Sequence, residues 1–192
     1  MIRLVGFVGP KGCGKDTASA FLVKAGKVNH KISFAGPLKQ ICAKIFHIKI
    51  MDMEHMDKKE AKAAVPYVLT KQVLKAIKHE LVKYVPELDV AKGVYKYNID
   101  RVSIAGIENR ELWSIREVLQ FVGTDFIREK VYKNWHLEAA FSKAVLAKCT
   151  TYHVYSVTDI RFENEYEFLK NTFPDSFKCY YIDNPVAEDG LA

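Results

Sequence analysis

The chain has 192 residues, of which 49% are hydrophobic and 27% are charged, so it can bury a core of its own and we expect a single domain. Charged residues or histidines interrupt every apolar stretch before it reaches the roughly 20 residues of a membrane span, so no membrane partner is expected. The net charge of +6 would attract nucleic acid, anionic lipid or a phosphorylated substrate, without choosing among them.

The N-terminal residues and the four cysteines of the chain indicate the cellular compartment. The apolar run at residues 2–8 stops at a glycine-rich segment and is too short for a secretory signal. The four cysteines show no CxxC spacing, so neither a zinc site nor a disulfide framework is expected. We therefore expect a protein of the reducing cytoplasm.

Strands and helices are predicted to alternate along the chain. Short apolar runs predict strands at residues 2–8, 30–34, 151–157 and 177–182. Apolar residues at helical spacing predict helices at residues 17–25, 37–46, 70–84, 113–122, 124–132 and 135–148, and a short helix around residues 166–169. This alternation favours an α/β fold, in which a mainly parallel sheet is covered by helices on both faces.

Local signals mark some of the boundaries. Ser114 and Glu117 have the spacing of a capping box at the start of a helix, and Gly123 is expected to end that helix. Residues 49–69 are rich in charge, and their pattern predicts no particular secondary structure. Residues 93–108 are expected to form a hairpin or an ordered loop outside the main sheet.

The first motif with chemical content is GPKGCGKDT at residues 9–17, between a predicted strand and a predicted helix. Glycines let backbone N–H groups converge on phosphate oxygens, the following helix presents its positive end, and Lys15 supplies a compact cation. The alternative is a glycine-rich turn without a ligand. We favour a nucleotide-binding loop, whose residues are Gly12, Cys13, Gly14, Lys15, Asp16 and Thr17.

Asp16 stands where this loop pattern usually has Ser or Thr, and Thr17 follows one position later. A carboxylate beside triphosphate oxygens is repelled unless a divalent cation lies between them. We therefore predict that Asp16 holds Mg²⁺ directly or through water, with the Thr17 hydroxyl as the other candidate. The alternative is that Asp16 caps the following helix through backbone N–H groups.

The second motif is TDIRFENE at residues 158–165, directly after the predicted strand at 151–157. Asp159, at the end of a strand next to a phosphate loop, can hold Mg²⁺ or its waters, and Arg161 projects from the same turn toward a transferred phosphate. Glu165 is close enough along the chain to orient the Arg161 guanidinium. The arrangement favours phosphoryl transfer; the alternative is a surface salt bridge that joins Arg161 to one of these carboxylates.

Two further segments and one residue complete a recognisable set: FAGPLK at residues 34–39, WSIREVLQFVGTD at 113–125, and Trp135. In this order and with the two motifs, they resemble the bacteriophage-type deoxynucleoside monophosphate kinases of the P-loop kinase superfamily, over about residues 3–182. The resemblance implies a P-loop NTPase-like three-layer sandwich over residues 1–192, with residues 49–112 as an acceptor-binding or lid insertion. It also implies ATP as the phosphoryl donor, Mg²⁺, and the host cytoplasm if the chain is viral.

The resemblance assigns roles to individual residues. Lys15, Asp16 and Thr17 would handle the ATP phosphates and Mg²⁺. The transfer site would be lined by Asp159, Arg161 and Glu165. The acceptor pocket would contain Arg116, Trp135 and Lys39. From the residues alone, two alternatives stay open: Trp135 as a core side chain, and Arg116 in a surface ion pair with Glu117, Asp125 or another acidic residue.

The predicted function is transfer of the γ-phosphoryl group of ATP to a deoxynucleoside 5′-monophosphate. The acceptor phosphate has a second pKa of about 6 and is largely a dianion at neutral pH, so no strong general base is required. One alternative is a phosphomevalonate-type kinase, which shares the GKD loop and the GPLK segment. Another is an ATPase switch or a basic nucleic-acid-binding protein, although the chain lacks a recognisable nucleic-acid-binding motif. The expected partners are small nucleotides and, at most, a second copy of the chain, with no stable nucleic-acid complex.

Overall fold

The computed structural model describes residues 3–10, 12–28, 30–85, 106–142 and 154–183. The chain divides into two compact units. The first unit consists of residues 1–34 and 143–192, and the second unit of residues 35–142. Residues 49–112, the predicted acceptor-binding insertion, thus belong to the second unit.

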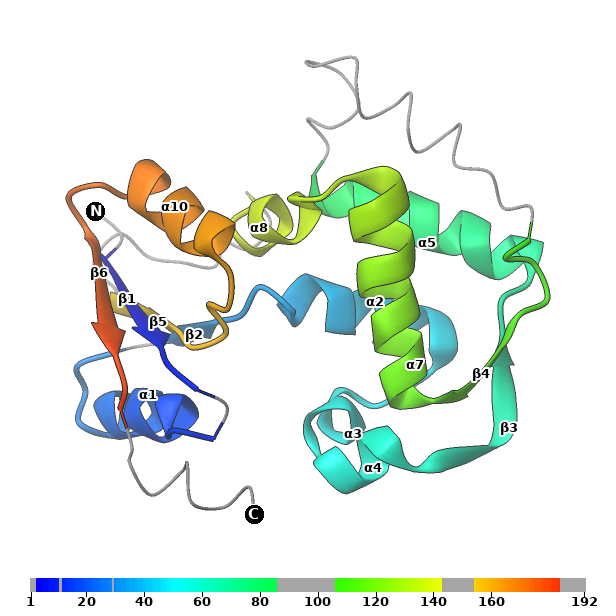
Figure 1. The fold of residues 1–192 in the computed structure, drawn as a ribbon, viewed down its shortest axis with the longest axis horizontal. Helices are drawn as coiled ribbons and strands as arrows, with labels where there is room; N and C mark the ends of the chain where they lie inside the picture. Colours follow the sequence, from blue (N-terminus) through cyan, green and yellow to red (C-terminus); the bar gives the residue numbers. More distant parts are fainter. Residues whose placement is uncertain (1–2, 11, 29, 86–105, 143–153, 184–192) are drawn as a thin grey trace. The chain divides into compact units, whose positions relative to one another are not determined.

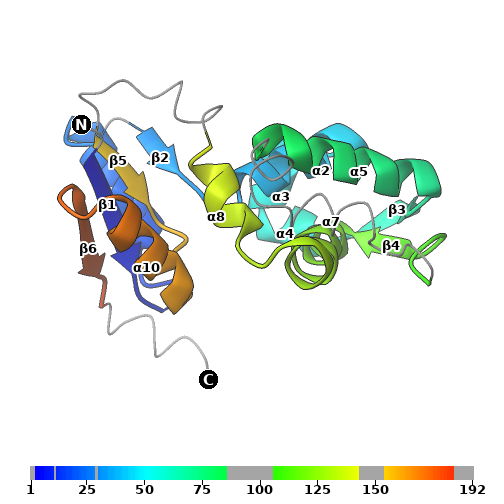
Figure 2. The ribbon, with the colours of Figure 1, turned by 90° about the horizontal axis from the view of Figure 1, so that it is seen from above.

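A four-stranded sheet forms the centre of the first unit. Its strands follow the order β2 (His30–Ile32), β5 (Val154–Val157), β1 (Arg3–Val8) and β6 (Phe177–Tyr181), and every described pairing is parallel. The first and the last described strands, β1 and β6, therefore lie side by side (Figures 1 and 2). The predicted mainly parallel α/β sheet is confirmed.

Helices α1 (Lys15–Lys24) and α10 (Glu163–Thr172) cover opposite faces of this sheet. Ser19 of α1 is hydrogen-bonded to Ser156 of β5 through their hydroxyl oxygens, 2.6 Å apart. The ring centroids of Tyr166 in α10 and Phe177 in β6 are 5.8 Å apart. The partners of Ser156 and Phe177 in β1 are consecutive residues, so these two side chains point to opposite faces. The sheet thus has a helix on each side, as the predicted fold requires.

The described part of the second unit consists of helices and a two-stranded antiparallel sheet. Its helices are α2 (Gly36–Phe46), α3 (Ile50–Glu54), α4 (Met56–Glu60), α5 (Lys71–Tyr84), α7 (Ile115–Gln120), the π-helical segment η2 (Phe121–Val131) and α8 (Trp135–Ala140). Strands β3 (Lys62–Val68) and β4 (Glu111–Ser114) form the small sheet. The core draws its side chains from several of these helices, including Ile41, Leu74, Ile77, Val118 and Phe126. Burial of these apolar groups is the main stabilising contribution.

Residues 49–69, which the sequence pattern left unassigned, form α3, α4 and β3. Pro66 lies within β3, where the pairing with β4 shifts register between Lys62 and Tyr67. Proline has no N–H to donate, so it is tolerated at such an irregularity. This strand is exposed along much of its length and lacks the apolar run of a buried strand.

The expected end of a helix at Gly123 is wrong, because α7 continues directly into η2. A Cβ at this position would lie 2.7 Å from Leu38 Cδ2, so the glycine permits close packing against α2 and does not terminate the helix. The expected cap at Ser114 is confirmed: its Oγ accepts from the Glu117 N–H at 3.1 Å. The Glu117 carboxylate accepts in turn from the N–H of Trp113 at 2.9 Å.

Parts of other predictions fall outside the described residues. They are most of the hairpin or loop at 93–108, the first three residues of the strand at 151–157, and the end of the helix at 135–148. The described part of that helix is α8, which ends at Ala140. In the part of the chain that the structure describes, no helix combines the length and the apolar character needed to cross a membrane.

Candidate active site

The loop between β1 and α1 depends on glycine at three positions. Gly9, Gly12 and Gly14 have φ values of 144°, 83° and 96°, in a region that other residues rarely adopt. At Gly9 a Cβ would also lie 2.3 Å from the Ile182 carbonyl oxygen, which directly follows β6. The glycine pattern of the sequence therefore has a direct backbone cause, and the loop is held between β1 and the end of β6.

Lys15 is the first residue of α1, and its ammonium group folds back over the loop. Its Nζ donates to the carbonyl oxygens of Gly9 at 2.7 Å and Pro10 at 2.5 Å, and lies 3.5 Å from Cys13 Sγ. Cys13 itself is buried. The loop thus holds a cation next to the N-terminal end of a helix, and both features favour an anionic ligand.

The Asp16 carboxylate is the negative group of the loop, with 76% of its side chain exposed. It forms an ion pair with Lys31 of β2 and accepts from the Thr158 hydroxyl at 2.8 Å. Burial opposes its charged form, but the hydrogen bonds from Lys31 and Thr158, together with the charges of Lys31 and Lys15, outweigh it. The pKa of Asp16 is therefore held below its ordinary value, and the group is an anion at neutral pH.

Asp159 follows β5 by two residues and accepts from the Ser33 hydroxyl at 2.6 Å. Ser33 in turn directly follows β2, which pairs with β5. The ends of two parallel strands thus fix this carboxylate, as expected for a residue at this edge of a sheet. Because Thr158 precedes Asp159 and is bonded to Asp16, the structure brings the loop and the second motif together.

Glu165 fixes the turn that carries Arg161. Its side chain is buried, and Oε2 accepts from the backbone N–H groups of Arg161 at 2.6 Å and Phe162 at 3.0 Å. The carboxylate thereby pairs donors at the start of α10 that would otherwise lack an intrahelical partner. These contacts position the backbone of Arg161, whereas the sequence pattern predicted that Glu165 orients the Arg161 guanidinium. The Arg161 residue is exposed.

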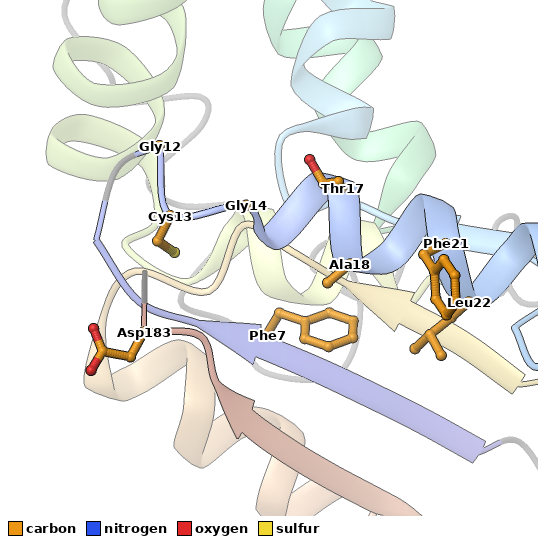
Figure 3. A pocket seen from close by; sticks show the side chains of 9 residues that line it. All are labelled: Phe7, Gly12, Cys13, Gly14, Thr17, Ala18, Phe21, Leu22 and Asp183. Carbon is orange, nitrogen blue, oxygen red and sulfur yellow. The ribbon is translucent and has the colours of Figure 1, made fainter. Parts of the chain in front are cut away.

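A pocket of about 730 Å³ adjoins the loop. Figure 3 shows Phe7 of β1 beneath α1, with Asp183 after β6 on the side of the loop. The walls are mainly apolar and carry one carboxylate. The lining residues are Phe7, Gly12, Cys13, Gly14, Thr17, Ala18, Phe21, Leu22 and Asp183.

In the second unit, both basic residues predicted to bind the acceptor form ion pairs. Arg116 pairs with Glu60, at the end of α4, and its side chain is 44% exposed. This partner is an acidic residue other than the two named as alternatives. Lys39 pairs with Glu54, with 3.2 Å between Nζ and Oε1.

Trp135 does not reach a ligand surface in this structure. The residue has no exposed area, its indole N–H donates to the Leu81 carbonyl oxygen at 3.3 Å, and its ring packs edge-on against Tyr84. An aromatic ring stacks on a base only through an accessible face. Trp135 is thus a core residue of the second unit, and the predicted stacking role receives no support from its surroundings.

Three residues that contact the candidate site received no role from the sequence: Lys31, Ser33 and Thr158, the last of which begins the second motif. Each supplies a donor to Asp16 or Asp159. The available signal was a polar residue in or just after a predicted strand whose end lies beside the loop. The parallel pairing of β2 with β5 brings Ser33 beside Asp159, and the packing of the loop brings Asp16 to Lys31 and Thr158.

A glycine loop between a central parallel strand and a helix, with a lysine over the loop and a carboxylate beyond the neighbouring strand, defines the P-loop kinase class. Within this class, the family model described as deoxynucleotide monophosphate kinase matches residues 3–174. The chain belongs to this family, and it is a nucleotide kinase that acts on deoxynucleoside monophosphates. Among curated proteins, none matches the chain in sequence.

Proposed function

We propose that this kinase transfers the γ-phosphoryl group of ATP to the phosphate of a deoxynucleoside 5′-monophosphate in the presence of Mg²⁺. The observation that carries the proposal is the grouping of Lys15 with two carboxylates, each held by a neighbouring strand end. The loop supplies Gly12, Cys13, Gly14, Lys15, Asp16 and Thr17 for the donor phosphates. In this mechanism, backbone N–H groups and the Lys15 ammonium align and neutralise phosphate oxygens, which is the main requirement of phosphoryl transfer.

The donor set near the loop fits Mg²⁺. Asp16 and Asp159 offer carboxylate oxygens and Thr17 a hydroxyl, and Mg²⁺ is usually bound by one or two carboxylates together with substrate phosphates and water. The ion pair of Asp16 with Lys31 shows that this carboxylate already attracts a cation. When bound, Mg²⁺ would neutralise charge on the phosphate oxygens.

Arg161 is the side chain that we assign to the transferred phosphoryl group. It is exposed, and Glu165 holds its backbone at the start of α10. A planar guanidinium can bind two phosphate oxygens at once, and this contact strengthens as negative charge redistributes during transfer. No side chain is assigned as a general base, because the acceptor phosphate is already largely a dianion.

Arg116 and Lys39 are the proposed anchors of the acceptor phosphate. Each now pairs with a single carboxylate, Glu60 or Glu54, and the Arg116 side chain is accessible to an anion. A dianionic phosphate offers more charge and more acceptor oxygens than one carboxylate, so exchange of partners is favourable.

We further propose that the pocket beside the loop receives the nucleoside of the donor. It shares Gly12, Gly14 and Thr17 with the proposed phosphate site, and its apolar walls suit a planar base. The Asp183 carboxylate lines the same pocket and can accept from an amino group on such a base.

The test is transfer of label from γ-³²P-ATP with Mg²⁺ to each of dAMP, dCMP, dGMP and dTMP. We expect labelled diphosphate with at least one acceptor and little release of inorganic phosphate when no acceptor is added. Phosphomevalonate and DNA serve as comparison additions. Rapid ATP hydrolysis without an acceptor, or stimulation by DNA alone, would contradict the proposal, and transfer only to phosphomevalonate would replace the substrate class.

A further inference from the structure

The Asp16 carboxylate is shared by two donors of different character. Lys31 Nζ and Thr158 Oγ1 both contact the same oxygen, Oδ1. Thr158 is neutral and only 4% exposed, whereas the Lys31 side chain is charged and 45% exposed. One carboxylate oxygen is thus bound by a buried hydroxyl and by a solvent-accessible cation.

The two donors also differ in how firmly they are held. Thr158 directly follows β5, and the next residue, Asp159, is bonded to Ser33, which directly follows β2. A short side chain on such a backbone has few alternative positions. The ammonium of Lys31 lies at the end of a flexible four-carbon chain, and it can leave the carboxylate without moving the strand.

These differences predict opposite effects on a cation that approaches Asp16. A fixed hydroxyl on Oδ1 limits rotation of the carboxylate and leaves Oδ2 with a defined orientation. An ammonium on Oδ1 cancels the negative charge that attracts a divalent cation and repels that cation directly.

We propose that Thr158 and Lys31 control the affinity of Asp16 for a divalent cation in opposite senses, Thr158 as a positioning residue and Lys31 as a competing cation. This inference rests on the proposed role of Asp16 as a metal ligand. In the nucleotide-free enzyme, Lys31 keeps the affinity of the site for the free metal low. Donor phosphates bring additional negative charge, so the metal enters together with the nucleotide and not ahead of it.

The test is titration of the nucleotide-free enzyme with Mn²⁺ alone, with free Mn²⁺ measured by electron paramagnetic resonance. Lys31→Met is expected to lower the Kd for Mn²⁺ about threefold to tenfold, because it removes a charge beside the ligand. Thr158→Val is expected to raise the Kd about twofold to fivefold, since the hydrogen bond that orients the carboxylate is lost. A general disturbance of the fold cannot produce opposite signs from these two variants.

Conservative variants and a matched control make the assay specific. Lys31→Arg and Thr158→Ser retain the charge and the hydroxyl, and both are expected to stay within about twofold of the wild-type Kd. Lys24→Met removes an exposed lysine at the far end of α1 and is likewise expected to change the Kd less than twofold.

Asp16→Asn distinguishes a failure of the proposed metal role of Asp16 from a failure of the proposed control by Lys31 and Thr158. If this variant binds Mn²⁺ as the wild type does, the proposed metal role of Asp16 fails. If Asp16→Asn weakens binding but Lys31→Met does not strengthen it, the proposed function stands and competition by Lys31 is wrong. An unchanged or lower Kd in Thr158→Val overturns the positioning role, and undetectable binding in both the wild type and Lys31→Met overturns the inference as a whole.

Discussion

The ammonium of Lys15 contacts two carbonyl oxygens of its own loop, so it is confined where the donor phosphates are proposed to bind. Lys15→Ala is expected to lower kcat/KM for phosphoryl transfer by about two to three orders of magnitude, because a preorganised charge is lost. Lys15→Arg is also expected to be poor, since a wider planar cation does not fit among the same carbonyl groups. Steady-state kinetics measure both effects.

The fold of the Lys15 variants is monitored by circular dichroism and thermal melting. Lys15 makes its described contacts within the loop, so the melting temperature should change little. Lys24→Ala, at the other end of the same helix, serves as the matched control and should keep wild-type kinetics. Near-wild-type turnover in Lys15→Ala would rule out the assignment of the loop.

Arg161 and Glu165 occupy one turn but are expected to respond differently to substitution. Arg161→Ala should lower kcat while the melting temperature stays close to that of the wild type, because the residue is exposed. Glu165→Ala leaves two backbone N–H groups without their carboxylate, so it should lower both kcat and stability, the latter by about 1–3 kcal/mol. Kinetics combined with urea denaturation separate the two residues. A stable Glu165→Ala variant with normal kcat would show that this carboxylate does not hold the turn.

At the scale of the elements, Glu80 links two helices of the second unit. Its carboxylate accepts from Lys44 of α2 at 2.8 Å and from Lys83 of its own helix, α5, at 2.7 Å. Burial opposes the charged form of Glu80, but the hydrogen bonds and charges of the two lysines outweigh it and keep the pKa of Glu80 below its ordinary value. A carboxyl group whose pKa is lower in the folded state stabilises the fold when it is ionised.

We therefore expect Glu80→Gln to lower the melting temperature by about 2–4 °C at neutral pH. The gap from the wild type should shrink as the pH falls below about 4.3, the ordinary pKa of glutamate, and through the lower folded pKa, since protonation removes the same interaction from the wild type. Thermal melting of both proteins as a function of pH measures this gap. A gap that is independent of pH would assign the loss to packing and not to charge.

At the scale of the whole molecule, the proposed donor and acceptor residues belong to different compact units. Lys15 lies in the first unit and Arg116 in the second. A ligand that binds only the folded state raises the melting temperature according to its concentration relative to Kd. Lys15→Ala should therefore lose stabilisation by ATP with Mg²⁺ and retain stabilisation by a deoxynucleoside monophosphate.

Arg116→Ala should lose stabilisation by a deoxynucleoside monophosphate and retain stabilisation by ATP with Mg²⁺. In steady-state kinetics, its acceptor KM should rise by about one to three orders of magnitude, whereas its ATP KM should stay nearly unchanged. Arg110→Ala is a matched control, because Arg110 pairs with Asp125 in the same unit at 3.6 Å. Differential scanning fluorimetry with each ligand measures the stabilisation. An unchanged acceptor response in Arg116→Ala would leave its contact with Glu60 as a surface ion pair only.

Local chemistry determined the features that the sequence predicted well. The glycines and Lys15 of the loop, the strand before it and the helix after it follow from backbone conformation and apolar patterning within a few residues. The same holds for the parallel α/β class and for the cap at Ser114. The family resemblance was likewise carried by contiguous segments, and the family match over residues 3–174 confirms it.

Tertiary structure decided which residues are in contact with one another. Pairing of β2 with β5 gives Asp159 its bond from Ser33, and the bond from Thr158 to Asp16 joins the two motifs, although these partners are far apart in sequence. Burial decided that Trp135 is a core residue, because an aromatic side chain at helical spacing is compatible with either a core or a ligand surface. Packing against Leu38 explains why residue 123 is glycine, whereas the local sequence pattern predicted that the helix ends there. In each case the deciding contact comes from a segment distant along the chain, and neither local propensity nor periodicity specifies it.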